Sequence, residues 1–177
     1  MRWSLYKNKN GGQRLSNIPK SKRSESKLEV LHRAIKLRKQ ITLMLRVMYT
    51  QAQKRIEKLS SEKELDLDAI RAEKFSLVLI DDECRAVAGI CRDLMSHLRN
   101  ANTIWPTYKA EFEERRLEMD RAMCCCNDLQ SELQYIAEAV YSDINKFAPL
   151  VLDVQEEFNM IKKLRQADNR FLKDIKA

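Results

Sequence analysis

The stretch Leu77–Leu98 reads LVLIDDECRAVAGICRDLMSHL, and it decides the fold class. Its main apolar positions recur at alternating intervals of three and four residues, which places them on one face of an α-helix. These positions are Leu77, Ile80, Cys84, Val87, Cys91, Leu94 and Leu98. Because such spacing is typical of helices that pack side by side, we expect one long amphipathic helix over residues 66–101.

Three further segments show the same spacing, and we predict helices over residues 26–59, 106–145 and 150–175. The 177 residues include only three Gly and three Pro, and because these residues break helices, their scarcity favours few, long helices. Short connections make neighbouring helices antiparallel. We therefore predict an all-α fold, either an up-down four-helix bundle or paired long antiparallel helical hairpins of coiled-coil type. It would form one domain over residues 25–177, behind a basic, flexible tail over residues 1–24.

Three charged residues fall on the apolar stripes, where a dry core would not accept them. These are Arg38, Glu73 and Arg115. A buried charge is unfavourable unless it is paired. We therefore expect these positions to mark where the bundle opens or meets another chain.

The charge of +7 is unevenly distributed along the chain. Residues 1–23 hold seven basic residues and no acid, and residues 27–59 hold nine basic residues and two acids. Residues 106–145 reverse this balance, with four basic and nine acidic residues. The N-terminal third is thus strongly cationic, and the segment 106–145 is acidic.

This cationic region predicts a site for an anionic partner, for which nucleic acid is the first candidate. The residues of the site in the tail are Arg2, Lys7, Lys9, Arg14, Lys20, Lys22 and Arg23, and those in the first helix are Arg33, Lys36, Lys39, Arg46, Lys54 and Lys58. Trp3 and Tyr6 lie among the tail cations and are suited to stacking on bases. The simpler alternative is that these cations only keep the surface soluble and the tail unfolded.

The tail also contains Ser16-Asn17-Ile18-Pro19, followed by Lys20, Lys22 and Arg23. This segment resembles the Ser-x-Ile-Pro peptide by which many microtubule-associated proteins are recruited by end-binding proteins. The resemblance covers four residues, with Ser16, Ile18 and Pro19 at the specified positions. It implies a cytoskeletal adaptor, and a purely protein–protein scaffold is a further alternative.

Catalytic and cofactor motifs are not found, and we predict a non-enzymatic protein without metal or cofactor. Zinc sites need four converging ligands, whereas Cys124, Cys125 and Cys126 have no second ligand pair, and His32 and His97 complete no triad pattern. Glycine loops that hold phosphate and the Glu-x-x-His pairs of di-iron bundles are also missing from the sequence. The expected role is that of a helical subunit of a larger assembly, bound to protein partners or to itself.

Localisation is predicted from apolar runs and cysteines. The longest uncharged apolar runs, such as Leu77-Val78-Leu79-Ile80, are far shorter than the roughly 20 residues of a spanning helix, and residues 1–24 hold no apolar stretch of a secretory signal. An odd number of cysteines, three of them consecutive, favours a reducing compartment such as the cytoplasm or nucleus. Mitochondrial import is an alternative, since the tail lacks acids and contains Arg and Ser.

Overall fold

A computed structural model describes residues 27–61, 66–139 and 144–174 of the chain. Most of these residues are helical, and the connection over residues 104–108 between the second and third helices is not. The α-helices are α1 (Lys27–Ser61), α2 (Leu67–Thr103), α3 (Lys109–Ala139) and α4 (Ala148–Ala167), and the 3-10 helices are η2 (Ile144–Lys146) and η3 (Asp168–Lys173). The predicted all-α fold is confirmed.

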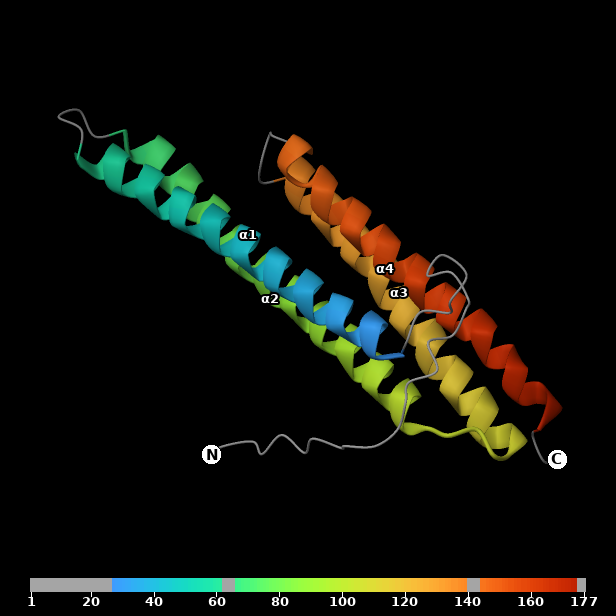
Figure 1. Ribbon diagram of the computed structural model, residues 1–177. Coiled ribbons are helices and arrows are strands. Elements are labelled where there is room, and N and C mark those ends of the chain that lie inside the picture. Colours follow the sequence, from blue (N-terminus) through green and yellow to red (C-terminus); the bar gives the residue numbers. More distant parts are fainter. Residues whose placement is uncertain (1–26, 62–65, 140–143, 175–177) are drawn as a thin grey trace, which may run out of the picture.

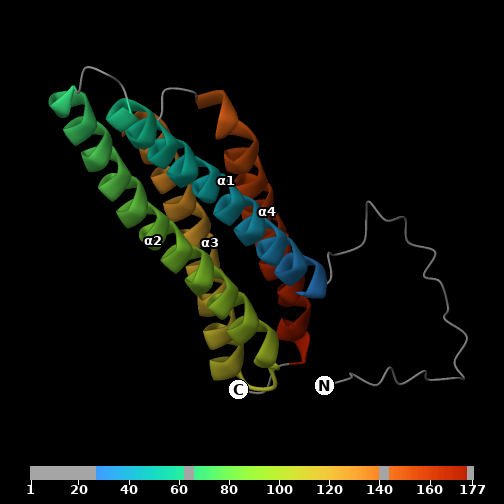
Figure 2. The ribbon, with the colours of Figure 1, turned by 90° about the vertical axis from the view of Figure 1, so that its left-hand side faces the viewer.

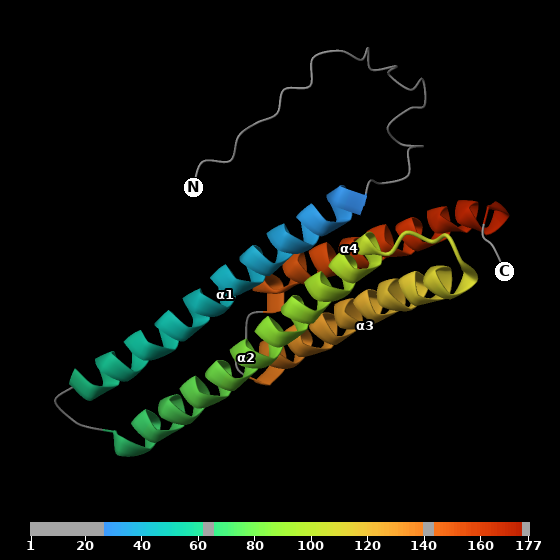
Figure 3. The same cartoon turned by 90° about the horizontal axis from the view of Figure 1, so that it is seen from below.

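The helices form two antiparallel hairpins that lie side by side, α1 with α2 and α3 with α4 (Figure 1). Each helix packs against its neighbour in the sequence, and α1 also contacts α4, so the predicted up-down bundle is closed into a ring. The C-terminal end of α1 and the N-terminal end of α4 lie at the same end of the bundle (Figure 2). Seen from below, the C-terminal part of α1 extends past the beginning of α4 (Figure 3). The contact between α1 and α4 is therefore the smallest in the ring.

Capping interactions explain where α2 and α3 begin. Asp66 Oδ1 accepts hydrogen bonds from the backbone N–H groups of Asp68, at 3.1 Å, and Ala69, at 2.9 Å, so Asp66 is the N-cap of α2. The third helix begins at Lys109, three residues after the predicted start at Pro106. The reason is that the Glu111 carboxylate accepts from the N–H groups of Thr107 and Tyr108, which stabilises the chain just before the helix.

The C-terminal bounds of the last two helices also differ from those expected. The third helix is described to Ala139; residues 140–143 of the predicted helix lie outside the described residues, and η2 follows them. The fourth helix ends at Ala167 and continues as η3, so the last turns of the predicted helix are wound more tightly.

The core contains most of the apolar stripe that the spacing predicts for α2. Ile80, Val87, Cys91, Leu94 and Leu98 of this stripe are buried. Val87, Cys91, Leu94 and Leu98 share one apolar cluster with buried residues of α3, which are Met119, Ala122, Cys126, Leu129, Leu133 and Ile136. Burying each large aliphatic side chain contributes about 1.5–3 kcal/mol, so this shared core holds the hairpins together.

Arg115 of α3 lies in this core, with a side chain that is 0% exposed. Its guanidinium is paired with the equally buried Asp168 and donates hydrogen bonds to the carbonyl oxygens of Ala101 and, at 3.0 Å, Ile104. These carbonyls lie at the C-terminal end of α2, where the helix dipole favours a cation. The expectation that Arg115 marks an opening is therefore wrong, because the side chain is buried and paired inside the chain.

Glu73 is likewise satisfied within the chain, since it accepts from Arg55 Nε at 3.0 Å across the α1–α2 contact. Arg38 differs from both, because its Nη1 donates to Met95 Sδ, at 3.7 Å, and not to a carboxylate. None of the helices in the described part of the chain has the length and hydropathy needed to cross a membrane.

Candidate anionic-partner surface

Five of the cations predicted for the first helix lie on the surface of α1. Lys36, Lys39, Arg46, Lys54 and Lys58 are all exposed, and within residues 27–61, 66–139 and 144–174 none of them forms an ion pair. At 1.5 Å per residue, the distance along the helix from Lys36 to Lys58 is about 33 Å. Their charges are thus open to solvent over most of the length of α1.

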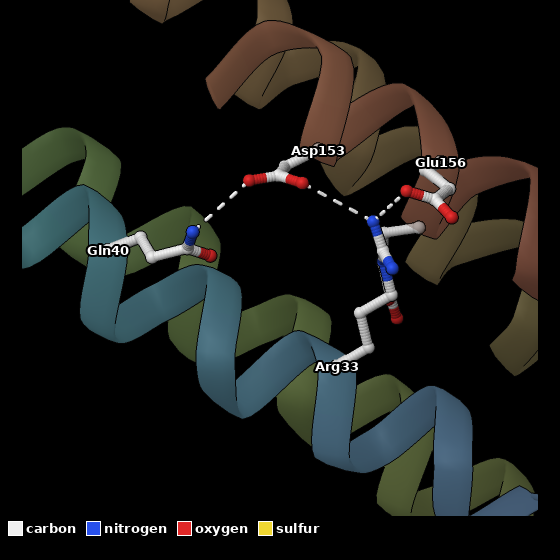
Figure 4. Close-up of polar contacts among 5 residues, drawn as sticks. Arg33, Gln40, Asp153 and Glu156 are labelled. Atoms are coloured by element: carbon white, nitrogen blue, oxygen red, sulfur yellow. Dashed lines mark hydrogen bonds and ion pairs between the residues drawn. The ribbon is translucent and has the colours of Figure 1, made fainter. Parts of the chain in front are cut away.

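Arg33, the sixth predicted cation of this helix, is held by acids of α4 (Figure 4). Its Nη2 donates to Asp153 Oδ1 at 3.3 Å and to Glu156 Oε2, and its Nε lies 3.9 Å from Oε2 of the buried Glu157. Gln40 adds a hydrogen bond to Asp153 Oδ2 at 3.2 Å. These contacts neutralise Arg33 and link α1 to α4.

The remaining predicted site residues lie outside the described residues. They comprise the seven tail cations (Arg2, Lys7, Lys9, Arg14, Lys20, Lys22 and Arg23) and the peptide Ser16-Asn17-Ile18-Pro19.

Two arginines of α2 extend the basic surface, although the sequence pattern had not singled them out. Arg92 and Arg99 are exposed, seven residues apart on one side of the helix, and form no ion pair with any residue of the described ranges. Arg92 follows Ala88 by four residues and precedes Met95 by three, and both of these residues line the outer seam between α1 and α2. The seven-residue spacing was available in the sequence and could have identified them.

The cysteines divide by burial. Cys91, Cys125 and Cys126 are buried, Cys84 is half-buried, Cys124 is exposed, and all are free thiols. Burial raises the pKa of Cys91 and of Cys125 to about 11, which makes both poor nucleophiles. Across the ranges that the structure describes, His, Cys, Asp and Glu form no group of three or more that could hold a metal ion.

The two histidines lie in different surroundings. His32 is exposed, whereas His97 Nδ1 lies 2.9 Å from Glu118 Oε2. Burial alone would raise the pKa of Glu118, but hydrogen bonds from His97, Arg121 and Asn100 outweigh it and lower that pKa below its usual value. This cluster links α2 to α3 through satisfied polar contacts.

Comparison of the chain with protein-family models, with curated proteins and with solved structures finds no match. The function must therefore be inferred from the surface of the chain itself.

Proposed function

We propose that the chain is a non-enzymatic helical subunit of a larger assembly, and that its basic face on α1 binds an anionic polymer, which we take to be nucleic acid. The observation that supports this most is the row of five exposed cations without ion-pair partners among the described residues. Residues 1–23 would add further cations to the same partner.

A polymer fits this row better than a small anion does. The cations span about 33 Å, close to one turn of duplex DNA, whereas a single phosphate group would engage one or two of them. Duplex DNA carries about one charge per 1.7 Å of axis, so every cation can approach a phosphate. Binding would be dominated by release of counterions and would fall steeply with salt.

The test is a salt titration by fluorescence anisotropy with labelled DNA duplexes and RNA. The full chain is compared with a chain lacking residues 1–23 and with the variant K36E/K39E/R46E. Since each lost phosphate contact lowers the slope of log affinity against log salt by about 0.9, we expect a slope smaller by about 2 to 3 in this variant. Truncation should lower both affinity and slope.

A matched control is K109E/K162E/K173E, which changes net charge equally at exposed positions on α3, α4 and η3. It should keep most of the affinity. Equal loss in both triple variants would show that net charge alone drives binding. If neither the full chain nor any variant binds at low salt, the nucleic-acid proposal is wrong, and the cytoskeletal and protein-scaffold alternatives take its place.

A further inference from the structure

Two adjoining grooves run along the outer seam between α1 and α2. One, of about 300 Å³, is lined by residues that include Leu45, Tyr49 and Ala88. The other, of about 490 Å³, is lined by residues that include Ile35 and Met95. Thr42 lines both, so the floor is continuous from Ile35 to Tyr49, about 21 Å along α1. That length matches about four turns of a helix.

The floor of these grooves is largely apolar and their margin is cationic. Lys39 and Arg46 line them from α1. On α2, helical spacing places Arg92 on the same side as the lining residues Ala88 and Met95. Asp81 is the acid among the lining residues, and Arg85 already binds it. The seam therefore offers apolar surface bordered by unpaired positive charge.

Arg38 lines the second groove, and the acceptor of its hydrogen bond is a poor one. Its Nη1 donates to Met95 Sδ at 3.7 Å, and the described residues offer it no other hydrogen-bond or ion-pair partner. A thioether sulfur is a weak acceptor, whereas a carboxylate accepts from a guanidinium through two short hydrogen bonds. A half-buried Arg38 in an apolar groove thus favours a ligand that brings a carboxylate.

The groove between α3 and α4 lacks this combination. It has a volume of about 560 Å³ and includes apolar residues such as Leu133 and Phe147, but its polar lining residues are Gln130, Gln134 and Glu138. Among the described residues, cations therefore border the grooves of the α1–α2 seam but not the groove between α3 and α4.

We propose that the α1–α2 seam binds an acidic amphipathic helix of a partner protein. Apolar side chains spaced by three and four residues would enter the grooves, and a carboxylate would bind Arg38. Lys39, Arg46 and Arg92 would attract the remaining acids of that helix. This goes beyond the proposed nucleic-acid site, because the partner is a protein and the recognition needs the apolar floor.

The probe is a labelled synthetic peptide of about 18 residues, with leucines spaced by three and four and glutamates beside them. A second peptide has the same composition with its leucines distributed over all faces of the helix. Anisotropy with the full chain should show the amphipathic peptide binding about tenfold or more tightly than the second one. Equal affinities would overturn the proposal, because they would mean that charge alone attracts the peptide.

Two variants localise the binding. Thr42→Trp fills the junction of the grooves without changing charge, and Arg38→Gln removes the guanidinium; each should weaken the amphipathic peptide about tenfold or more. Val47→Trp adds the same side chain at an exposed position of α1 that lines neither groove, and it should bind as the unchanged chain does. Circular dichroism verifies that all three fold.

Unchanged peptide affinity in both T42W and R38Q would place the peptide elsewhere and refute the seam. Duplex DNA is titrated in parallel, and T42W should leave its affinity unaltered, because the cations of α1 remain. If DNA fails to bind, the peptide affinities still test the seam. Failure of the nucleic-acid proposal is therefore distinguishable from failure of the seam proposal.

Discussion

Arg115 and Arg33 both pair with acids of the C-terminal part of the chain, but they do so in different solvent environments. The side chains of Arg115 and Asp168 are 0% exposed. The side chain of Arg33 is 26% exposed, and those of Asp153 and Glu156 are 35% and 62% exposed. The first pair lies where α2, α3 and η3 meet, and the second pair lies on the seam between α1 and α4.

Similar ion pairs therefore have different roles within one bundle. Removing one partner of a buried ion pair strongly destabilises the fold, because the remaining charge has neither a counter-charge nor water. A solvated pair contributes little, since water and salt replace the lost partner. Removing Arg115 should therefore destabilise the bundle much more than removing Arg33.

The largest expected effect comes from Arg115→Met. It leaves Asp168 buried without a cation and removes the donor to the carbonyls of Ala101 and Ile104. We expect the free energy of unfolding to fall by about 3–5 kcal/mol, measured by urea unfolding followed by circular dichroism.

A double variant, R115M/D168L, sharpens that test. Arg115 Nη2 and Asp168 Oδ1 have no hydrogen-bond partner in the described chain, so the pair is not fully satisfied. Replacing both charges should therefore be less destabilising than R115M alone. A loss below about 1 kcal/mol in R115M would show that water reaches the guanidinium and would remove the contrast with Arg33.

An intermediate effect is expected for Glu118→Gln, at the α2–α3 contact. Glu118 accepts from Asn100 at 3.1 Å and from Arg121 at 2.6 Å, and it pairs with His97. Losing these charge-assisted hydrogen bonds should lower the free energy of unfolding by about 1–2 kcal/mol at neutral pH.

The effect of E118Q should depend on pH. The pKa of Glu118 is lower in the folded chain than its usual value, so its ionised form stabilises the fold above the usual carboxyl pKa. That contribution is lost as pH falls through the folded pKa. Unfolding measured over a series of pH values below about 7 should therefore show the difference between variant and unchanged chain shrinking as the pH is lowered. A difference that stays constant down to the pH at which the unchanged chain unfolds in acid would mean that the effect is steric.

Arg33→Gln should have the smallest effect, about 0.5–1 kcal/mol at low salt and less at high salt. The reason is that the α4 acids it leaves behind, Asp153 and Glu156, remain hydrated. Urea unfolding at two salt concentrations provides the measurement. A loss above about 3 kcal/mol would show that the buried Glu157, 3.9 Å from Arg33 Nε, depends on this cation, and the seam would then resemble the Arg115 site.

The fold was predictable because spacing by three and four residues is a local property that the packed structure keeps. The α2 stripe is buried where it was expected, apart from the half-buried Leu77 and Cys84. The ends of helices were less predictable, since α3 begins at Lys109 and not at Pro106, and Glu111 in its first turn accepts from the N–H groups just before it.

The environment of each charge was not predictable from local pattern. Arg38 and Arg115 both fall on apolar stripes, yet Arg115 meets Asp168, 53 residues away in sequence, while Arg38 meets a thioether. Arg33 and Lys36 are three residues apart on one helix, and only the position of α4 decides that Arg33 is paired. Contacts between distant segments decide these outcomes, so a pattern within one helix does not predict them.

The run Cys124-Cys125-Cys126 crosses the boundary between water and core within a single helical turn, since Cys124 is exposed and Cys126 is 0% exposed. An alkylating reagent therefore reaches Cys124 at once but reaches Cys126 only when α3 separates from its neighbours. The rate of Cys126 alkylation, compared with that of Cys124, therefore reports how often this separation occurs. Mass spectrometry of the peptide that carries Cys124, Cys125 and Cys126 would measure how often the bundle opens, from the growth of its doubly and triply alkylated forms after the immediate labelling of Cys124.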